Sequence, residues 1–401
     1  MGCLAGPGDD IPAIRRSLEE TRVTCGPPPQ SLFTTALPYP VFAANPAGLT
    51  TQGRQLVEAA CPGFQANSVS RTVLFALSAV AEGLTQAGID LDRLRSGRVG
   101  IALGTTVGCT FHDEEYYIAW RQGLAPDLAP VRSFLGGNVA AAVHRILGTK
   151  GPSVVVTNAC ASGTDAIGIA RNWLRQGHCD FALAGGADEL SRVAYNGFVS
   201  LMLSDESPCR PFNGDRQGLN LGEGAGVLIL EREDDCRKRH GRPVGRILGY
   251  GCGADAYHPT APHPEGRGLQ NALRQALGEA AQPGVPALIN AHGTGTKAND
   301  LAETTALARI FPGKDRPILV STKGLTGHTL GAAGGIEAIL TLVALSEGVT
   351  PGTVGCRDPD PHFAYSPLVQ GITRPLSGRW GLSQSLAFGG GNSALVLEVL
   401  T

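Results

Sequence analysis

The sequence predicts an α/β fold made of two similar halves. Short β-branched runs alternate with helical stretches along the 401 residues, and the chain is long enough to bury a sizeable core. A strand–loop–helix pattern also occurs twice, at residues 152–167 and again at 317–338. We therefore expect an N-terminal half, residues 1–241, and a C-terminal half, residues 242–401.

The individual elements follow from the same alternation. Runs rich in Val, Ile and Leu are typical of strands buried on both faces, and longer stretches between them are expected to be helical. The segment 21–50 is rich in proline and polar residues, so we expect it to be irregular. The expected strands are 99–103, 153–157, 181–184, 225–231, 287–290, 318–321 and 393–399, and the expected helices are 68–87, 163–175, 268–280, 300–310 and 332–347.

Composition excludes several classes of protein. The 33 basic and 35 acidic residues give a net charge of -2, which does not favour nucleic acid or an anionic membrane. The ten cysteines are scattered and form no CxxC pair, so we interpret them as reduced thiols of a cytoplasmic protein. No run of about 18 apolar residues is free of charges and turn formers, and the first residues lack the pattern of a secretory signal.

The first candidate for chemistry is Cys160, in the stretch VTNACASGTDAIG. It follows an expected strand and precedes an expected helix, so the positive end of the helix dipole favours its thiolate. Small neighbours leave room for an acyl chain or a pantetheine arm, and such a turn can direct backbone N–H groups at an oxyanion. The alternative is a buried structural cysteine, which this context disfavours.

The second candidate is His292, in the stretch NAHGTGTKAND. It follows an expected strand and lies in a loop where Thr294 and Thr296 offer hydroxyl groups to a polar arm. Taken alone, a loop histidine that bonds to its own backbone is the more common case.

A third stretch, STKGLTGHTLGAAGGIEA, combines a lysine, a histidine and a carboxylate. Lys323 precedes His328 by five residues, and Glu337 lies on the helix that follows. Lys323 would either add positive potential to a site or form a structural ion pair with Glu337, and the sequence leaves both readings open.

The last stretch, LAFGGGNS, places one aromatic ring among small residues. Phe388 would gate a pocket beside Gly389 and Gly390, or pack as core in a turn that leads to the last strand. The histidines show no metal-binding spacing, and neither GxGxxG nor GxxxxGK[ST] occurs, so a metal or nucleotide enzyme is not expected.

Together these motifs resemble the β-ketoacyl-acyl carrier protein synthases of the thiolase superfamily, especially the synthase II type. The resemblance covers nearly the whole chain, and five blocks occur in the family's order. They are TNACASGTDAIG, CRPFNGDRQGLNLGEGAGVLILE, NAHGTGTKANDLAE, STKGLTGHTLGAAGGIEA and AFGGGNSALVLE.

The resemblance implies a duplicated, layered αβαβα fold and a decarboxylating condensation. It makes Cys160 the nucleophile, while His292 and His328 bind the malonyl thioester and promote loss of CO2. Lys323 and Glu337 then support the site, and Phe388 contributes an oxyanion-hole amide and a gate. The expected substrate-binding residues are Thr294, Thr296, Gly389 and Gly390. The two threonines contact the phosphopantetheine arm of an acyl carrier protein, and no tightly bound cofactor is implied.

The chain departs from the family in three places, and one alternative function remains. Either the usual first strand is missing or the start is unusual, because the chain opens at Met1-Gly2-Cys3, inside the family's first motif. Before the gate, Leu386 replaces an aromatic residue and Ala387 replaces a glycine. Around residues 68–76 only Arg71 offers a positive charge for docking a carrier protein. Relatives act as homodimers or with a chain-length-factor subunit, and a non-catalytic chain-length factor is the alternative, which the presence of Cys160 and both histidines opposes.

Overall fold

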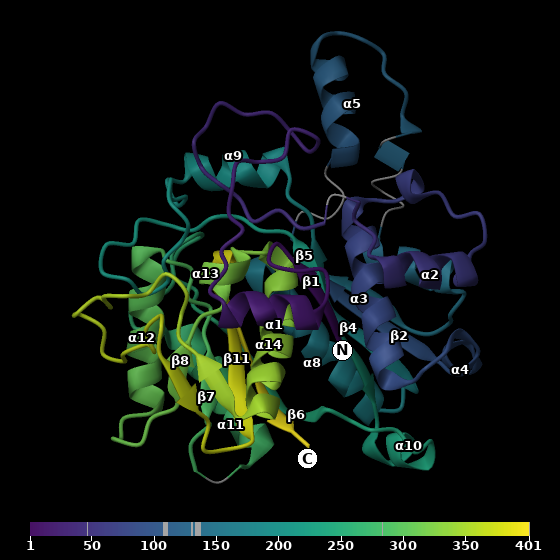
Figure 1. The fold of residues 1–401 in the computed structure, drawn as a ribbon. Helices are drawn as coiled ribbons and strands as arrows, with labels where there is room; N and C mark the ends of the chain where they lie inside the picture. Colours follow the sequence, from purple (N-terminus) through teal and green to yellow (C-terminus); the bar gives the residue numbers. More distant parts are fainter. Residues whose placement is uncertain (46, 107–110, 130, 133–137, 283, 401) are drawn as a thin grey trace.

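Two five-stranded mixed sheets, one from each half of the sequence, form the framework of the protein (Figure 1). The computed structural model describes residues 1–401 except 46, 107–110, 130, 133–137, 283 and 401. The strand order is β1-β5-β4-β2-β3 in the first sheet and β6-β12-β11-β7-β8 in the second. The strands are β1 Gly2–Ala5, β2 Val99–Gly104, β3 Ser153–Val156, β4 Phe181–Asp188, β5 Gly224–Glu231, β6 Gly245–Ala254, β7 Leu288–Asn290, β8 Ile318–Val320, β11 Trp380–Leu386 and β12 Gly391–Val399.

The two sheets have the same topology, position by position. In each sheet the last three strands in this order are parallel to one another, while the first two pair antiparallel. β3 and β8, which begin the two copies of the strand–loop–helix pattern, occupy equivalent edges. The expected duplication is therefore confirmed, and the fold is the thiolase-like one.

Helices separate and cover the sheets to give the αβαβα layers. α8 (Ser162–Arg175) and α14 (Ala333–Glu347) pack between the sheets, so each is buried over most of its length. α3 (Arg71–Ala87) covers the outer face of the first sheet, and α11 (Arg267–Ala280) and α12 (Lys297–Ile310) lie on the second half's outer side. The remaining helices of at least six residues are α1 Ile11–Glu19, α2 Thr51–Ala60, α4 Leu91–Ser96, α5 Phe111–Arg121, α7 Val139–Leu147, α9 Arg192–Ser200 and α10 Glu233–Lys238.

The prediction that the first strand is missing is wrong. Gly2–Ala5 forms β1, which pairs antiparallel with β5 in the register Gly2↔Val227 to Ala5↔Gly224. The strand is short because the chain turns at Gly6, and α3 packs tightly over its start. A Cβ on Gly2 would lie 2.0 Å from the Ala79 carbonyl oxygen, so only glycine permits this approach.

Two strands of the second sheet, β6 and β11, were not predicted. β6 alternates glycine with larger residues, and β11 carries Ser383, Gln384 and Ser385 although it is fully buried. Neither has the apolar run on which the strand predictions rest. The predicted irregularity of residues 21–50 is confirmed for the part that the structure describes.

One helical segment, Leu330–Glu347, is long and apolar enough to cross a membrane by length and composition alone. Within the described structure 83% of it is buried between the sheets, which makes it a core helix. The nine cysteines of the described residues are all free, as expected, and Cys109 lies outside that part of the chain.

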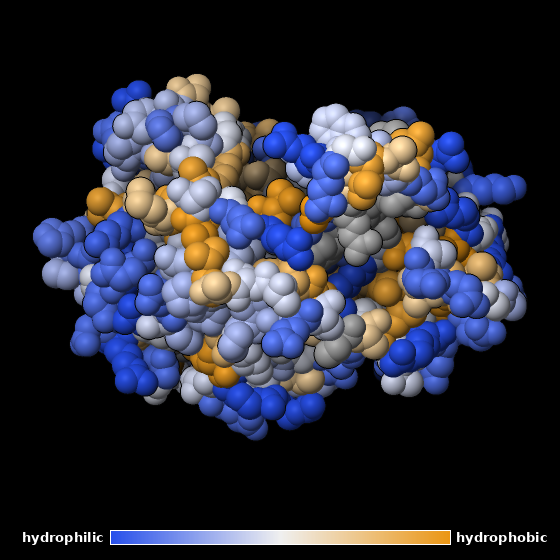
Figure 2. Space-filling view, turned by 90° about the horizontal axis from the view of Figure 1, so that it is seen from above, coloured by the Kyte–Doolittle hydropathy of each residue, from blue (hydrophilic) through white to orange (hydrophobic). Residues whose placement is uncertain are grey.

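Seen from the side of α5 and α9, the surface is hydrophilic with separate hydrophobic patches (Figure 2). The exposed large apolar side chains on and just after α5 are Tyr117, Ile118, Trp120, Leu124 and Leu128, and those on and after α9 include Val193, Leu201 and Met202.

Candidate active site

Three loops bring the predicted reactive side chains together. Cys160 lies in a 3₁₀ turn, Ala159–Ala161, between β3 and α8, and His292 and His328 follow β7 and β8. The carboxyl ends of parallel strands meet at one edge of a sheet, so such loops are natural places for a site. One ligand atom from each side chain lies within 4.8 Å of the others, and all three residues are buried.

The turn at Cys160 is strained in a way that exposes the thiol to the histidines. Ala159 has a φ of 43°, a left-handed conformation that side-chain-bearing residues rarely adopt. Sγ of Cys160 lies 3.0 Å from Nε2 of His328, and the backbone N–H of Phe388 donates a hydrogen bond to the same sulfur. The thiol therefore faces one imidazole and one backbone donor.

Hydrogen bonds define which nitrogen of His328 carries the proton. The backbone N–H of Leu330 donates to Nδ1 of His328 over 3.1 Å, so in the neutral ring the proton resides on Nε2. Nε2–H then points at the Cys160 sulfur. In this tautomer His328 is a hydrogen-bond donor to the site and not a base.

The lysine and glutamate of the third sequence block control His292. Nζ of Lys323 donates to Nδ1 of His292 over 3.2 Å and forms an ion pair with the Glu337 carboxylate. Because an ammonium group only donates, the His292 proton also resides on Nε2. Lys323 thus places its positive charge at the site and also forms the ion pair with Glu337, so both predicted roles of this residue are found together.

Burial determines the protonation of the site. It lowers the pKa of both His292 and His328 well below the ordinary value, and the positive charge of Lys323 lowers the two values further. Both rings are therefore neutral at physiological pH. Burial also raises the pKa of Glu337 to about 7, against the opposing effect of Lys323.

The expected stabilisation of the Cys160 thiolate is not found in this state of the protein. Burial raises the pKa of Cys160 to about 12, although Lys323 and the Phe388 amide act in the opposite direction. The sequence indicated the helix dipole correctly, but it did not show that the thiol is 3% exposed. Desolvation of the anion outweighs the dipole.

A cavity of about 430 Å³ opens onto the three reactive side chains. Thr294 and Thr296 line it, and their hydroxyl groups lie 2.9 Å apart. The Phe388 ring also lines it, whereas Gly389 and Gly390 lie outside the lining and form the turn behind that ring. The amide of Gly389 donates to the Pro259 carbonyl over 2.7 Å.

Comparison with known proteins agrees with this geometry. Residues 1–236 match the family described as Beta-ketoacyl synthase, N-terminal domain, and residues 244–357 match Beta-ketoacyl synthase, C-terminal domain. The chain belongs to the beta-ketoacyl synthase family. It is 35% identical over 348 residues to 3-oxoacyl-(acyl-carrier-protein) synthase 2 of Synechocystis sp., an alignment that covers 83% of each protein.

Solved ketosynthase structures have the same fold over the whole chain. A chain of the ishigamide ketosynthase/chain length factor superposes with a TM-score of 0.90 at 30% identity, covering 100% of this chain and 98% of that one. A Xenorhabdus doucetiae ketosynthase in complex with its chain length factor gives a TM-score of 0.78 at 29% identity, covering 100% and 96%.

Sequence reasoning missed two residues of this ketosynthase site. Phe198 of α9 stacks on Phe388 with ring centroids 5.2 Å apart and also meets the His328 ring edge-on. Glu303 of α12 is buried and accepts hydrogen bonds from the amides of His292 and Gly293 and from Gln384. Glu303 lies in the NAHGTGTKANDLAE block, but its bonds to the His292 loop depend on the fold, and nothing in the α9 sequence marks Phe198.

Arg71 does not serve as the free docking charge that the sequence offered. Its guanidinium forms a salt bridge with the buried carboxylate of Glu223 and donates to the Asn45 carbonyl. The side chain is 13% exposed, so it stabilises the interior.

The set of one thiol and two imidazoles also has the donor composition of a zinc site. The Lys323 ammonium 3.2 Å from His292 disfavours a second positive charge at this place. The absence of a metal in the working enzyme stays a prediction.

Proposed function

We propose that this ketosynthase is a working 3-oxoacyl-acyl carrier protein synthase in which Cys160 carries the growing acyl group. It is an acyltransferase of fatty acid or polyketide and polyene biosynthesis. The observation that carries the proposal is the approach of the Cys160, His292 and His328 side chains to within 4.8 Å at the end of one cavity.

In the first half-reaction the Cys160 sulfur attacks the carbonyl carbon of an acyl thioester. The carbon–sulfur bond to the carrier breaks, and the carrier thiol leaves with the proton that Cys160 gives up. The amides of Phe388 and Cys160 are the proposed donors to the oxyanion. Because the free thiol is protonated, the Nε2–H of His328 is expected to stabilise sulfur charge as it develops.

In the second half-reaction a malonyl thioester loses CO2 and condenses with the acyl group. The electrons of the breaking carbon–carbon bond form an enolate, whose oxygen accepts from the Nε2–H groups of His292 and His328. The enolate carbon attacks the acyl carbonyl, the bond to Cys160 breaks, and the thiolate takes up a proton. The products are CO2 and a 3-oxoacyl thioester that is two carbons longer.

Lys323 and Glu337 are proposed to hold His292 in the donor tautomer. The Lys323 bond to Nδ1 and the burial of both rings support this role, because a charged imidazole would have no acceptor at Nδ1. The enzyme then needs neither a metal nor a tightly bound cofactor, since its substrates arrive as thioesters.

The phosphopantetheine arm of an acyl carrier protein is the proposed occupant of the 430 Å³ cavity. The Thr294 and Thr296 hydroxyl groups are placed to contact its amides. Gly389 and Gly390 are proposed to act through the turn, letting Phe388 move when the arm enters. The relative from Synechocystis sp. bears the name of an acyl-carrier-protein synthase, which supports this partner.

The assembly is proposed to be a dimer, with a second copy or with a chain-length-factor relative. The exposed apolar side chains of α5 support a protein partner, as do the solved ketosynthases paired with chain length factors. We also propose the division of the chain at residue 241 and a cytoplasmic location.

The test is product formation from acyl- and malonyl-carrier protein, read by mass spectrometry, with Cys160→Ala as the inactive control. A 3-oxoacyl product made only by the unaltered enzyme supports the proposal. Product from both proteins would overturn it. If the enzyme alone gives none, the assay is repeated with a chain-length-factor relative as partner. Continued absence of both product and Cys160 acylation supports the chain-length-factor alternative.

A further inference from the structure

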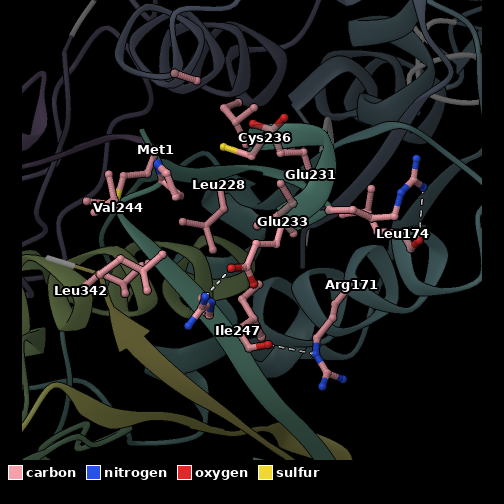
Figure 3. A pocket seen from close by; sticks show the side chains of 18 of the residues that line it. Met1, Arg171, Leu174, Leu228, Glu231, Glu233, Cys236, Val244, Ile247 and Leu342 are labelled. Carbon is pink, nitrogen blue, oxygen red and sulfur yellow. Dashed lines mark hydrogen bonds and ion pairs between the residues drawn. The ribbon is translucent and has the colours of Figure 1, made fainter. Parts of the chain in front are cut away.

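A second cleft, of about 410 Å³, is lined by residues of both halves of the sequence (Figure 3). β5 runs from the active-site end of the first sheet to the cleft. Its first residue, Gly224, pairs with Asp188, whose carboxylate accepts from the Gly331 amide beside the active site. Its last residue, Glu231, lines the cleft, and the eight residues of the strand span about 23 Å at 3.3 Å per residue.

The floor of the cleft is aliphatic. Leu174 of α8, Leu228 and Leu230 of β5, Ile247 of β6 and Leu342 of α14 surround it, and Figure 3 shows several of these side chains pointing into the space. Among the described lining residues there is no Phe, Tyr, Trp or His. A nucleobase or other flat ring would therefore lack the aromatic partner it prefers, whereas a flexible hydrocarbon chain fits.

The rim of the cleft is rich in arginine, and most of these side chains are fixed. Arg239 forms an ion pair with Glu231, and Arg246 with Glu233, which neutralises both carboxylates of the lining. Arg171 donates to the Ile247 and Leu248 carbonyls, over 3.1 and 2.8 Å. These bonds fix the walls of the cleft, and both carboxylates among the described lining residues are paired with arginine.

Two arginines of the rim remain available. Arg175, at the end of α8, and Arg242, just before β6, are exposed and form no hydrogen bond or ion pair with any residue that the structure describes. A hydrocarbon floor beneath two uncommitted guanidinium groups matches a molecule with an aliphatic tail and an anionic head.

We infer that this cleft binds an amphipathic aliphatic anion, with its chain on the leucine floor and its carboxylate or phosphate head between Arg175 and Arg242. This site is distinct from the one that carries the acyl group. The inference does not depend on Cys160 being the nucleophile. Carboxylate and phosphate heads share the same recognition chemistry, so both are tested.

The test uses dodecanoate and dodecyl phosphate carrying a diazirine at the chain end, with the cross-links on the full-length protein mapped by peptide mass spectrometry. The expected result is labelling of the peptides that contain Leu174, Leu230 and Ile247, apart from any label near Cys160. Competition with unlabelled dodecylammonium should be weak, because its charge opposes the rim. The relative yield of the two probes tells a carboxylate ligand from a phosphate ligand.

The double variant Arg175→Ala/Arg242→Ala should reduce labelling of these peptides about 3- to 10-fold, as expected for loss of two solvent-facing charge-assisted contacts. The matched control is Arg93→Ala/Arg145→Ala, which removes two exposed arginines that do not line the cleft and should leave labelling unchanged. Val244→Asp, which places an anion in the cleft, should act like the double variant. Labelling confined to the Cys160 cavity, equal reduction in the control, or effective competition by dodecylammonium would each overturn the inference.

Discussion

Replacing His292 by alanine should separate the two half-reactions. Cys160 contacts His328 at 3.0 Å, whereas the bond that the structure gives to the His292 ring is to Lys323. Acyl transfer to Cys160 therefore does not need His292, because His328 and the Phe388 amide are the donors next to the sulfur. The enolate of the second half-reaction loses one of its two imidazole donors.

The magnitude follows from the loss of a buried, preorganised donor. Removing one oxyanion donor costs about 2.7–4 kcal/mol, or roughly 10²- to 10³-fold in rate. His292 is 3% exposed, so water does not readily replace it. We expect condensation to fall by this factor and acylation of Cys160 to change by less than about fivefold, which is about 1 kcal/mol.

The assay follows both steps in one preparation. Intact-protein mass spectrometry measures the rate at which Cys160 gains an acyl group from acyl-carrier protein alone. Release of CO2 and formation of the 3-oxoacyl product are then measured after malonyl-carrier protein is added. His178→Ala, which removes an exposed histidine, is the control and should leave both rates unchanged.

Equal loss of both half-reactions in His292→Ala, with folding unchanged by circular dichroism, would refute this reasoning. It would mean that His292 serves the whole site and not the enolate. Unchanged condensation would refute it as well, since one donor would then suffice.

Three further predictions concern the thiol and its surroundings. Because burial holds the pKa of Cys160 at about 12, its alkylation by iodoacetamide should rise about tenfold per pH unit from pH 7 to 10, and a plateau below pH 9 would show a stabilised thiolate instead. Phe198→Ala should lower the free energy of unfolding by about 3 kcal/mol in urea titration and weaken acyl selectivity through the freed Phe388 ring, with Phe198→Leu intermediate; wild-type stability would contradict the stacking. Glu303→Ala leaves three buried donors unpaired and should lower the free energy of unfolding by about 3 kcal/mol or more. Glu303→Gln should lower it by less, because the amide oxygen still accepts some of these bonds. Equal losses in the two variants would contradict the bonding pattern.

The sequence predicted most strands of the two sheets because these strands are apolar runs. β2, β3, β5, β7, β8 and β12 are apolar runs that lie within the sheets, and their bounds were predicted to within a few residues. The repeated pattern around β3 and β8 also indicated the duplication, since equivalent strands lead into the two central helices.

The failures have physical causes. β11 is a central strand, but three of its buried residues are Ser383, Gln384 and Ser385, so it lacks an apolar signal. β6 reads as glycine-rich because α11 packs closely on it, and a Cβ on Gly249 would lie 2.0 Å from the Ala276 carbonyl oxygen. β1 is only four residues long and is defined by its partner β5.

The reactive residues could be named from local motifs, but their protonation could not. Whether a thiol at a helix start is charged depends on how deeply the folded chain buries it and on groups distant in sequence, such as Lys323 and the Phe388 amide. Likewise the partners of Lys323 were predicted only as alternatives, because its bond to His292 joins loops 31 residues apart in sequence.

The most direct measurement of the central claim is the position of the acyl group on the enzyme. The protein is incubated with acyl-carrier protein in the absence of malonyl-carrier protein, digested at low pH and examined by peptide mass spectrometry. The proposed mechanism predicts a single thioester adduct on the peptide that contains Cys160, and its disappearance when malonyl-carrier protein is added. An adduct on another cysteine, or 3-oxoacyl product without any adduct on Cys160, would contradict it.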